Sequence, residues 1–141
     1  MNILEFFTKT KKQILVIDDE SAINDLLAVA LRSAGYRVFT AGNADEGLEI
    51  LSAKNIDLII TDIRMPFKNG IEFIRELKQE DEHRHTPVFF MSGYYSPKEM
   101  QRLRDKFKDI EVFNKPIQIS KLVRKVNTCI QGGTDVAIEG R

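Results

Sequence analysis

The stretch ILVIDD, residues 14–19, decides the fold expected for this chain, because four apolar residues lead directly into two adjacent carboxylates. A second apolar run ends at Asp62, and a third leads to Lys115. Strands this apolar are normally buried on both faces of a parallel sheet, and their carboxyl ends lie along one edge of it. Acids gathered at that edge repel one another unless a cation lies among them. The pattern therefore indicates a divalent metal with a lysine close by, an arrangement suited to phosphoryl chemistry.

Outward from this stretch, apolar runs alternate with segments whose apolar residues recur at helical spacing. The predicted strands are residues 13–17, 36–40, 57–61, 88–91 and 110–113. Helical spacing predicts a helix after each strand, and the last helix, ending near Ile130, has the clearest apolar stripe. Repeated strand–helix units predict a doubly wound parallel α/β sheet with right-handed crossovers and helices on both faces.

Length and composition favour one compact domain and limit its partners. The chain has 141 residues, 43% of them hydrophobic, and its 21 basic residues balance its 21 acidic ones. That balance argues against direct nucleic-acid binding, which calls for a cationic excess. The single cysteine, Cys129, cannot form an internal disulfide, which favours a reducing cytoplasm. No apolar stretch approaches the roughly 20 residues of a membrane helix, so no membrane association is expected.

The predicted domain covers residues 13–130. Residues 1–12 fall outside the alternating pattern and are expected to form a short N-terminal extension. Residues 131–141 lack periodicity, and the final IEGR resembles a protease-recognition linker added for expression. A flexible tail is therefore expected there.

Side chains able to do chemistry follow the predicted strands at corresponding positions. They are Asp18, Asp19, Asp62, Ser92 and Lys115. Taken singly, each acid is explained as a helix N-cap and the lysine as a solvated surface charge. That explanation weakens when five residues share the same edge of the sheet.

These residues and their neighbours resemble the receiver domain of bacterial two-component response regulators. The matching motifs are ILVIDDE at 14–20, DIRMP at 62–66 with Gly70, MSG at 91–93, and KP at 115–116. Each motif is weak alone, but their order and spacing are specific, and the resemblance covers residues 13–130. It implies a (βα)5 flavodoxin-like fold with strand order 2-1-3-4-5, in which strands one and three are neighbours.

The resemblance also implies a role for each site residue. Asp62 is the expected phosphoacceptor, with Lys115 and Ser92 contacting the phosphoryl oxygens. Mg²⁺ is the expected cofactor, with Mn²⁺ as a substitute, and its expected protein ligands are Asp18, Asp19, Asp62 and the main-chain carbonyl of Arg64. Phosphoryl transfer with a loose transition state needs mainly positioning and charge neutralisation, which this set provides.

Phosphorylation is expected to draw Ser92 inward and to reshape the face made by the fourth helix, the fifth strand and the fifth helix. Family members usually carry an aromatic switch residue three positions before the lysine. Here that position is Val112, and Phe113 is predicted to point to the opposite face. Gly93 is expected to loosen the moving loop, and a cis bond before Pro116 is compatible with the sequence.

Two bulky residues flank the expected acyl phosphate. Arg64 and Tyr94 lie where relatives vary and where side chains can limit the access of water. Their size predicts slow self-dephosphorylation.

Two other functions stay open at this point. A Mg²⁺-dependent phosphatase of the haloacid-dehalogenase type also uses an aspartate after its first strand, but that family has Asp-x-Asp there. This chain has Asp18-Asp19-Glu20, and its better nucleophile follows the third strand. A non-phosphorylated interaction module on the same fold is the second alternative. Under the receiver hypothesis the chain is a signalling switch and not an enzyme.

The partners follow from the receiver hypothesis only in part. The expected phosphodonor is a histidine kinase or a histidine phosphotransfer protein, and a homodimer is compatible with either phosphorylation state. The downstream target is unknown. The chain is either a stand-alone protein or part of a larger regulator or hybrid kinase.

Overall fold

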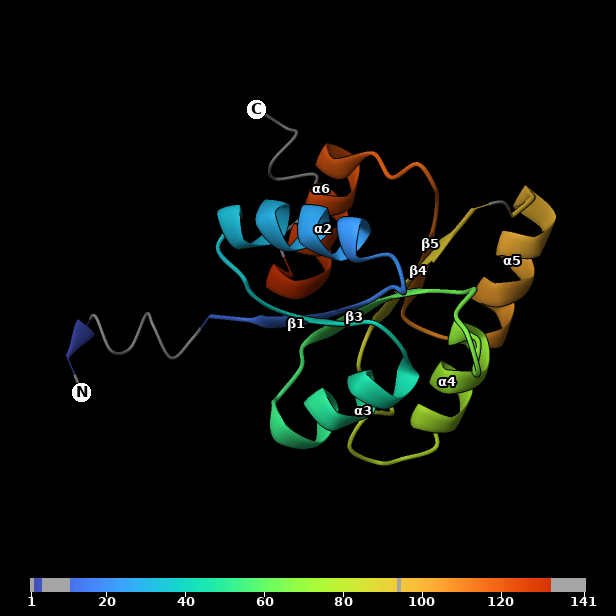
Figure 1. Ribbon diagram of the computed structural model, residues 1–141, viewed down its shortest axis with the longest axis horizontal. Coiled ribbons are helices and arrows are strands. Elements are labelled where there is room, and N and C mark those ends of the chain that lie inside the picture. The colour runs from blue at the N-terminus through green and yellow to red at the C-terminus, as the bar shows by residue number, and fades with distance from the viewer. Residues whose placement is uncertain (1, 4–10, 94, 133–141) are drawn as a thin grey trace.

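The computed structural model describes residues 2–3, 11–93 and 95–132. Five strands alternate with five helices over this part of the chain (Figure 1). The strands are β1 (Gln13–Ile17), β2 (Arg37–Ala41), β3 (Leu58–Asp62), β4 (Val88–Ser92) and β5 (Ile110–Asn114). The helices are α2 (Ser21–Ser33), α3 (Ala44–Ala53), α4 (Gly70–Leu77), α5 (Pro97–Lys106) and α6 (Ile119–Gln131). Most of the predicted N-terminal extension and C-terminal tail, and Tyr94, lie outside the described residues.

All described strand pairs are parallel, and the strand order is β2-β1-β3-β4-β5, as predicted. In the register of β1 with β3, Ile17 lies beside Thr61, so the residues that follow β1 lie next to the end of β3. In the register of β3 with β4, Asp62 lies beside Met91. The topology therefore brings the carboxyl ends of β1, β3 and β4 to one edge.

Helices cover both faces of the sheet (Figure 1). Leu15, Ile17 and Ile59 pack with residues of α3, α4 and α5, whereas Ile14 and Val16 pack with residues of α2 and α6. Residues 14–17 are each 0% exposed, so alternate residues of β1 fill two separate cores. Burial on both sides explains why β1, β3 and β4 are largely apolar runs rather than alternating ones.

The helix starts differ in one respect that matters for the site. Asn43, Asn69 and Ser96 each accept a hydrogen bond from the backbone N–H three residues on, which caps α3, α4 and α5. Glu20 occupies the equivalent position before α2, but its side chain makes no capping hydrogen bond. Its carboxylate is thus not used at the helix start.

Some predicted boundaries shift by a residue. The second strand begins at Arg37 rather than at residue 36, because Gly35, with φ of 102°, ends α2 and the Tyr36 N–H donates back to the Leu31 carbonyl. Asp62 and Ser92 are the last residues of β3 and β4 rather than the residues after them. The edge of the sheet that carries them is unchanged.

The loop between β3 and α4 packs tightly against the end of β3. Gly70 donates its N–H to the Ile63 carbonyl at 2.8 Å, and a Cβ at Gly70 would lie 2.2 Å from the Asp62 carbonyl oxygen. The left-handed residue of this loop is Phe67, with φ of 73°, and its side chain is fully exposed. Asn69 caps α4, and Gly70 is the first residue of that helix.

Candidate functional site

Three carboxylates meet at the carboxyl edge of the sheet. One oxygen each from Asp18, Asp19 and Asp62 lies within 4.8 Å of the others. Asp18 is 0% exposed and Asp62 is 5% exposed, whereas Asp19 is exposed to solvent. The first two acids follow β1 and the third ends β3, so the pairing of these neighbouring strands creates the cluster.

A single ammonium group holds the two buried acids. Lys115 Nζ donates to Asp18 Oδ2 at 2.8 Å and to Asp62 Oδ2 at 3.1 Å, and it lies 3.4 Å from Glu20 Oε1. The lysine follows β5, and its N–H donates to the Ser92 carbonyl at 2.6 Å. The Lys115-Pro116 peptide bond is cis. The lysine therefore reaches the acids from the far side of β4.

The electrostatics of the cluster follow from burial and close contact. Burial raises the pKa of Asp18 above its ordinary value; the Lys115 hydrogen bond opposes this shift, and the nearby Asp62 charge adds to it. Burial lowers the pKa of Lys115, but the hydrogen bonds to Asp18 and Asp62 and the charges of both acids outweigh it and hold that pKa well above the ordinary lysine value. Lys115 is therefore charged at any physiological pH.

The residues at this edge fit a divalent metal. All the candidate side-chain ligands are carboxylate oxygens, which are the hard ligands that Mg²⁺ prefers. Three carboxylates against one ammonium leave the pocket with excess negative charge, which a bound divalent cation would neutralise. The Arg64 N–H donates to Asp62 Oδ1 at 3.3 Å, which orients the acid from the side of the following loop.

The remaining predicted residues lie around this pocket. Ser92 ends β4 and is 1% exposed, and a Cβ at Gly93 would meet nothing within 4 Å. Val112 packs on the α3, α4 and α5 side of the sheet, whereas Phe113 packs on the α2 and α6 side. There the centroid of the Phe113 ring lies 5.3 Å from the centroid of the Phe89 ring. The aromatic side chain thus lies on the opposite face from Val112.

Two contacts of this site were not predicted from the sequence. Asn24 Nδ2 donates to the carbonyls of Asp18 at 2.9 Å and of Ala41 at 3.0 Å, which ties the ends of β1 and β2 together. Glu20 lies close to Lys115. An asparagine among the apolar residues of a helix was a signal for the first contact, but no pattern in the sequence indicated the second.

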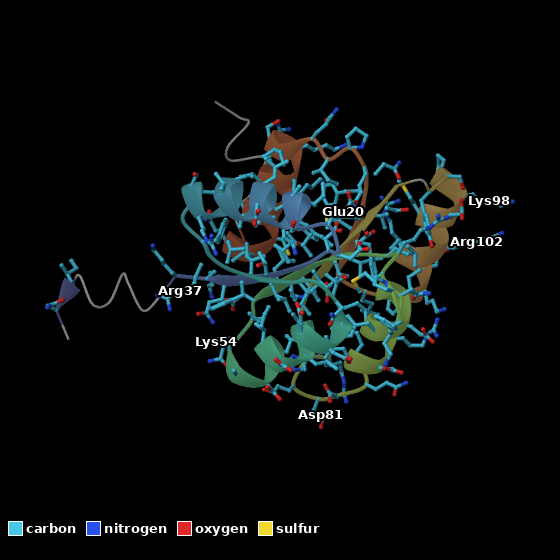
Figure 2. The ribbon with its side chains drawn as sticks, viewed as in Figure 1. Glu20, Arg37, Lys54, Asp81, Lys98 and Arg102 are labelled. Atoms are coloured by element: carbon cyan, nitrogen blue, oxygen red, sulfur yellow. The ribbon has the colours of Figure 1, made fainter. Side chains whose placement is uncertain are left out.

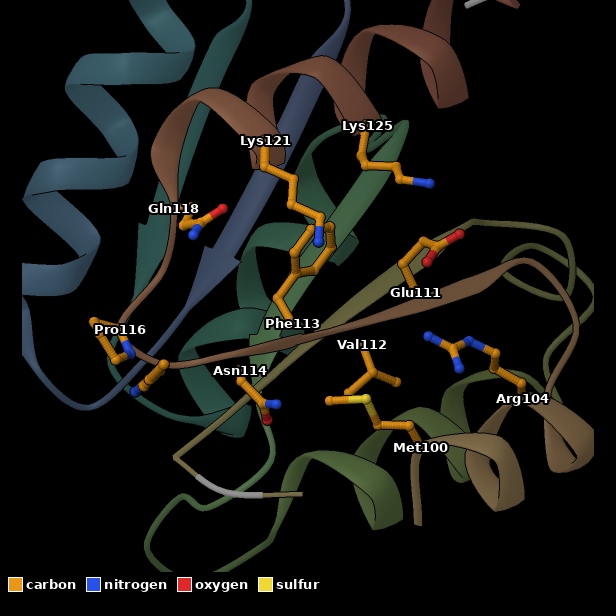
Figure 3. Close-up of a pocket in the computed structure, with 11 residues that line it drawn as sticks. Met100, Arg104, Glu111, Val112, Phe113, Asn114, Pro116, Gln118, Lys121 and Lys125 are labelled. Atoms are coloured by element: carbon orange, nitrogen blue, oxygen red, sulfur yellow. The ribbon is translucent and has the colours of Figure 1, made fainter. Parts of the chain in front are cut away.

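A groove lies beside the site on the face formed by α5, β5 and α6 (Figure 3). It has a volume of about 620 Å³, and Val112 and Met100 form its apolar floor. Lys121, Lys125 and Glu111 line the other side. Lys115 also lines this groove, so one residue belongs both to the acid site and to this face.

Comparison with known proteins decides the family. A sequence model of the response regulator receiver domain matches residues 14–127. This chain is a receiver domain of the response regulator family.

Curated relatives of the receiver domain come from bacteria and plants. The two-component response regulator ORR3 of rice is 33% identical over 83% of this chain and 89% of its own length. The transcriptional regulatory protein KdpE of Escherichia coli is 32% identical over 84% of this chain and 51% of its own length. The sensor kinase/phosphatase CqsS of Vibrio cholerae is 35% identical over 64% of this chain, which spans only 13% of that protein.

Solved structures show the same fold. The chemotaxis response regulator CheY4 of Vibrio cholerae superposes with a TM-score of 0.77 at 26% identity, covering 85% of this chain and 99% of that one. A receiver domain protein from Clostridium thermocellum superposes with a TM-score of 0.74 at 31% identity, covering 86% and 95%. Within the described residues of the present chain, no helix has the length and apolar character needed to span a membrane.

Proposed function

We propose that this receiver domain is a phosphorylation switch that accepts a phosphoryl group on Asp62 from a histidine kinase or a histidine phosphotransfer protein. The observation that carries the proposal is the contact of one lysine with two buried acids, Asp18 and Asp62, at 2.8 and 3.1 Å. A structural salt bridge needs one acid, whereas a phosphoacceptor site needs a nucleophilic acid, acids for a metal and a cation for the product. The reaction would take place in the cytoplasm.

The transfer step makes one bond and breaks one. An Asp62 carboxylate oxygen attacks the phosphorus atom, a P–O bond forms, and the P–N bond to the donor histidine breaks with its electron pair staying on that nitrogen. The imidazole leaves neutral, because its other ring nitrogen already carries the proton. Lys115 is already in contact with Asp62 Oδ2, so its ammonium is next to the place where a phosphoryl oxygen would lie. Ser92, at the end of the neighbouring strand, would donate its hydroxyl to another phosphoryl oxygen.

Asp18, Asp19 and an Asp62 oxygen would hold Mg²⁺ or Mn²⁺, with the main-chain carbonyl of Arg64 as the further proposed ligand. The bound cation would neutralise negative charge between the acceptor and the incoming phosphoryl group. Because Asp18 is buried and its backbone is bound by Asn24, its carboxylate has little freedom to turn away.

The signal would leave through the face formed by α5, β5 and α6. Ser92 and Lys115 are joined by a backbone hydrogen bond of 2.6 Å, so movement of one is passed to the other. Lys115 lines the groove of Figure 3, and Val112, in place of the usual aromatic residue, forms part of its floor. We infer that phosphorylation changes the population of groove conformations without changing the fold.

Labelling with a small phosphodonor tests the proposal. The protein is incubated with Mg²⁺ and acetyl phosphate, and its intact mass is measured. A single phosphoryl adduct supports the receiver function. Absence of an adduct would favour the non-phosphorylated interaction module, and sustained hydrolysis of small phosphate esters would favour the phosphatase.

The exposed apolar side chains of α2 are expected to contact the phosphodonor protein. Leu26 and Val29 are 52% and 64% exposed, on a helix that begins two residues after Asp19. Replacing both with serine is expected to slow transfer from a donor protein that phosphorylates the wild type by about tenfold, because buried apolar contact is lost from the encounter. Labelling by acetyl phosphate, measured in parallel, should be unchanged. Equal transfer rates from the donor protein would place its contact elsewhere.

Arg64 is expected to prolong the life of the acyl phosphate. Arg64 lies two residues after Asp62 and its side chain is exposed. Burial and the Glu99 charge raise the pKa of Tyr95, and the Arg64 charge opposes this shift. Replacing Arg64 with asparagine should shorten the phosphoprotein lifetime several-fold, because a smaller side chain admits water to the phosphorus. Decay is followed by intact mass after the donor is removed. An unchanged or longer lifetime in Arg64→Asn would contradict this role.

A further inference from the structure

Lys115 has a third carboxylate neighbour that belongs to neither the metal cluster nor the phosphoacceptor. Glu20 Oε1 lies 3.4 Å from Lys115 Nζ, a longer contact than those to Asp18 and Asp62. Glu20 lies just before α2, at the carboxyl edge of the sheet (Figure 2). Its side chain is 64% exposed, so solvent reaches this contact but hardly reaches the other two.

The backbone of Glu20 is held by a hydrogen bond, while its carboxylate is not engaged in capping the helix. The Glu20 N–H donates to Asp18 Oδ1 at 2.9 Å, which places the residue against the acid cluster. The three helices with capped starts use Asn or Ser at this position, but the Glu20 side chain makes no capping hydrogen bond. The side chain that would otherwise stabilise the helix start extends instead toward Lys115.

Phosphorylation of Asp62 changes the effect of the contact between Glu20 and Lys115. Asp62 then carries an acyl phosphate, Asp18 and Asp19 are committed to the cation, and Lys115 has to bind a phosphoryl oxygen. Glu20 is the carboxylate within reach of Lys115 that is committed to neither group. Its negative charge competes with the phosphoryl oxygens for the ammonium and repels an anionic donor, while it adds to the attraction for a cation.

We propose that Glu20 is a positioning residue that restrains Lys115. Its negative charge lowers the reactivity of the site toward doubly charged phosphodonors and strengthens the binding of a divalent cation. This inference rests on the proposed function. The two effects of its charge have opposite signs, and no purely structural role of Glu20 produces that combination.

The test compares wild type with Glu20→Gln, which keeps the shape and removes the charge. Labelling at saturating Mg²⁺ is measured by intact mass with acetyl phosphate, a dianion at neutral pH, and with phosphoramidate, mainly a monoanion. We expect labelling by acetyl phosphate to rise by roughly three- to fivefold, the range of an exposed ion pair, and labelling by phosphoramidate to rise less. The difference should shrink as ionic strength increases.

Calorimetric titration with MgCl2 alone supplies a readout without any donor. Glu20→Gln should weaken Mg²⁺ binding by a similar factor, and Glu20→Asp should return both properties toward wild type. Glu49→Gln removes another exposed charge, on α3, and should change neither.

The outcomes separate this inference from the proposed function. If wild type is not labelled, the proposed function fails and this inference fails with it. If wild type is labelled but Glu20→Gln reacts at the same rate, reacts more slowly, or changes equally with both donors, the role of Glu20 alone is overturned. Unchanged or tighter Mg²⁺ binding in Glu20→Gln would overturn it as well.

Discussion

Replacing Asp62 with asparagine is expected to reduce phosphoryl labelling by acetyl phosphate and Mg²⁺ by about three orders of magnitude or more. The amide is a poor nucleophile, and the change also removes one of three clustered carboxylates. Intact mass should show no adduct under conditions that label wild type fully. The fold should persist, because Lys115 keeps its contacts with Asp18 and Glu20.

A matched control separates the chemistry from the loss of a charge. Asp25→Asn makes the same substitution at an exposed position on α2 and should leave labelling unchanged. Peptide mapping of labelled wild type adds a second check. An adduct on Asp18 in place of Asp62 would move the nucleophile to the end of the first strand, as in the phosphatase alternative, and full labelling of Asp62→Asn would reject Asp62 as the acceptor.

The fold was predictable because β1, β3 and β4 are buried on both faces, which leaves uninterrupted apolar runs in the sequence. Periodicity alone does not order parallel strands, and the order came from the family resemblance. The β2 boundary was wrong by one residue because the turn after α2 extends through Gly35 and the Tyr36 N–H donates to the Leu31 carbonyl. Local hydrogen bonds of this kind leave no clear trace in a hydrophobic pattern.

The site also has features that the sequence predicts and features that it does not. Strand ends carry Asp18, Asp62 and Lys115, so the topology alone brings these residues to one edge. The contact of Glu20 with Lys115 spans 95 residues of sequence and depends on two side-chain conformations, which no spacing encodes. The left-handed backbone at Phe67 was equally hidden, because the residue types that favour that conformation, Asn69 and Gly70, come two and three positions later.

Replacing Gly70 with alanine is expected to lower the free energy of unfolding by about 2–4 kcal/mol, the largest stability effect expected of a single methyl group here. The added Cβ would lie 2.2 Å from the Asp62 carbonyl oxygen and 3.2 Å from the Ile63 Cα, and both are backbone atoms. Side chains yield by changing rotamer, but these atoms move only if the end of β3 moves. Because that strand end carries Asp62, the variant should also be labelled more slowly by acetyl phosphate.

Two other glycines of the chain give a graded control for this effect. A Cβ at Gly47 would lie 2.7 Å from Ile17 Cδ1, the mobile end of a side chain, and a Cβ at Gly93 would meet nothing within 4 Å. In urea denaturation followed by circular dichroism, Gly93→Ala should lie within about 0.5 kcal/mol of wild type, Gly47→Ala should be intermediate, and Gly70→Ala should be the least stable. If Gly70→Ala unfolds at the same urea concentration as Gly93→Ala, the loop does not pack against the end of β3. Asp62 would then owe its position to the sheet alone, without support from the loop.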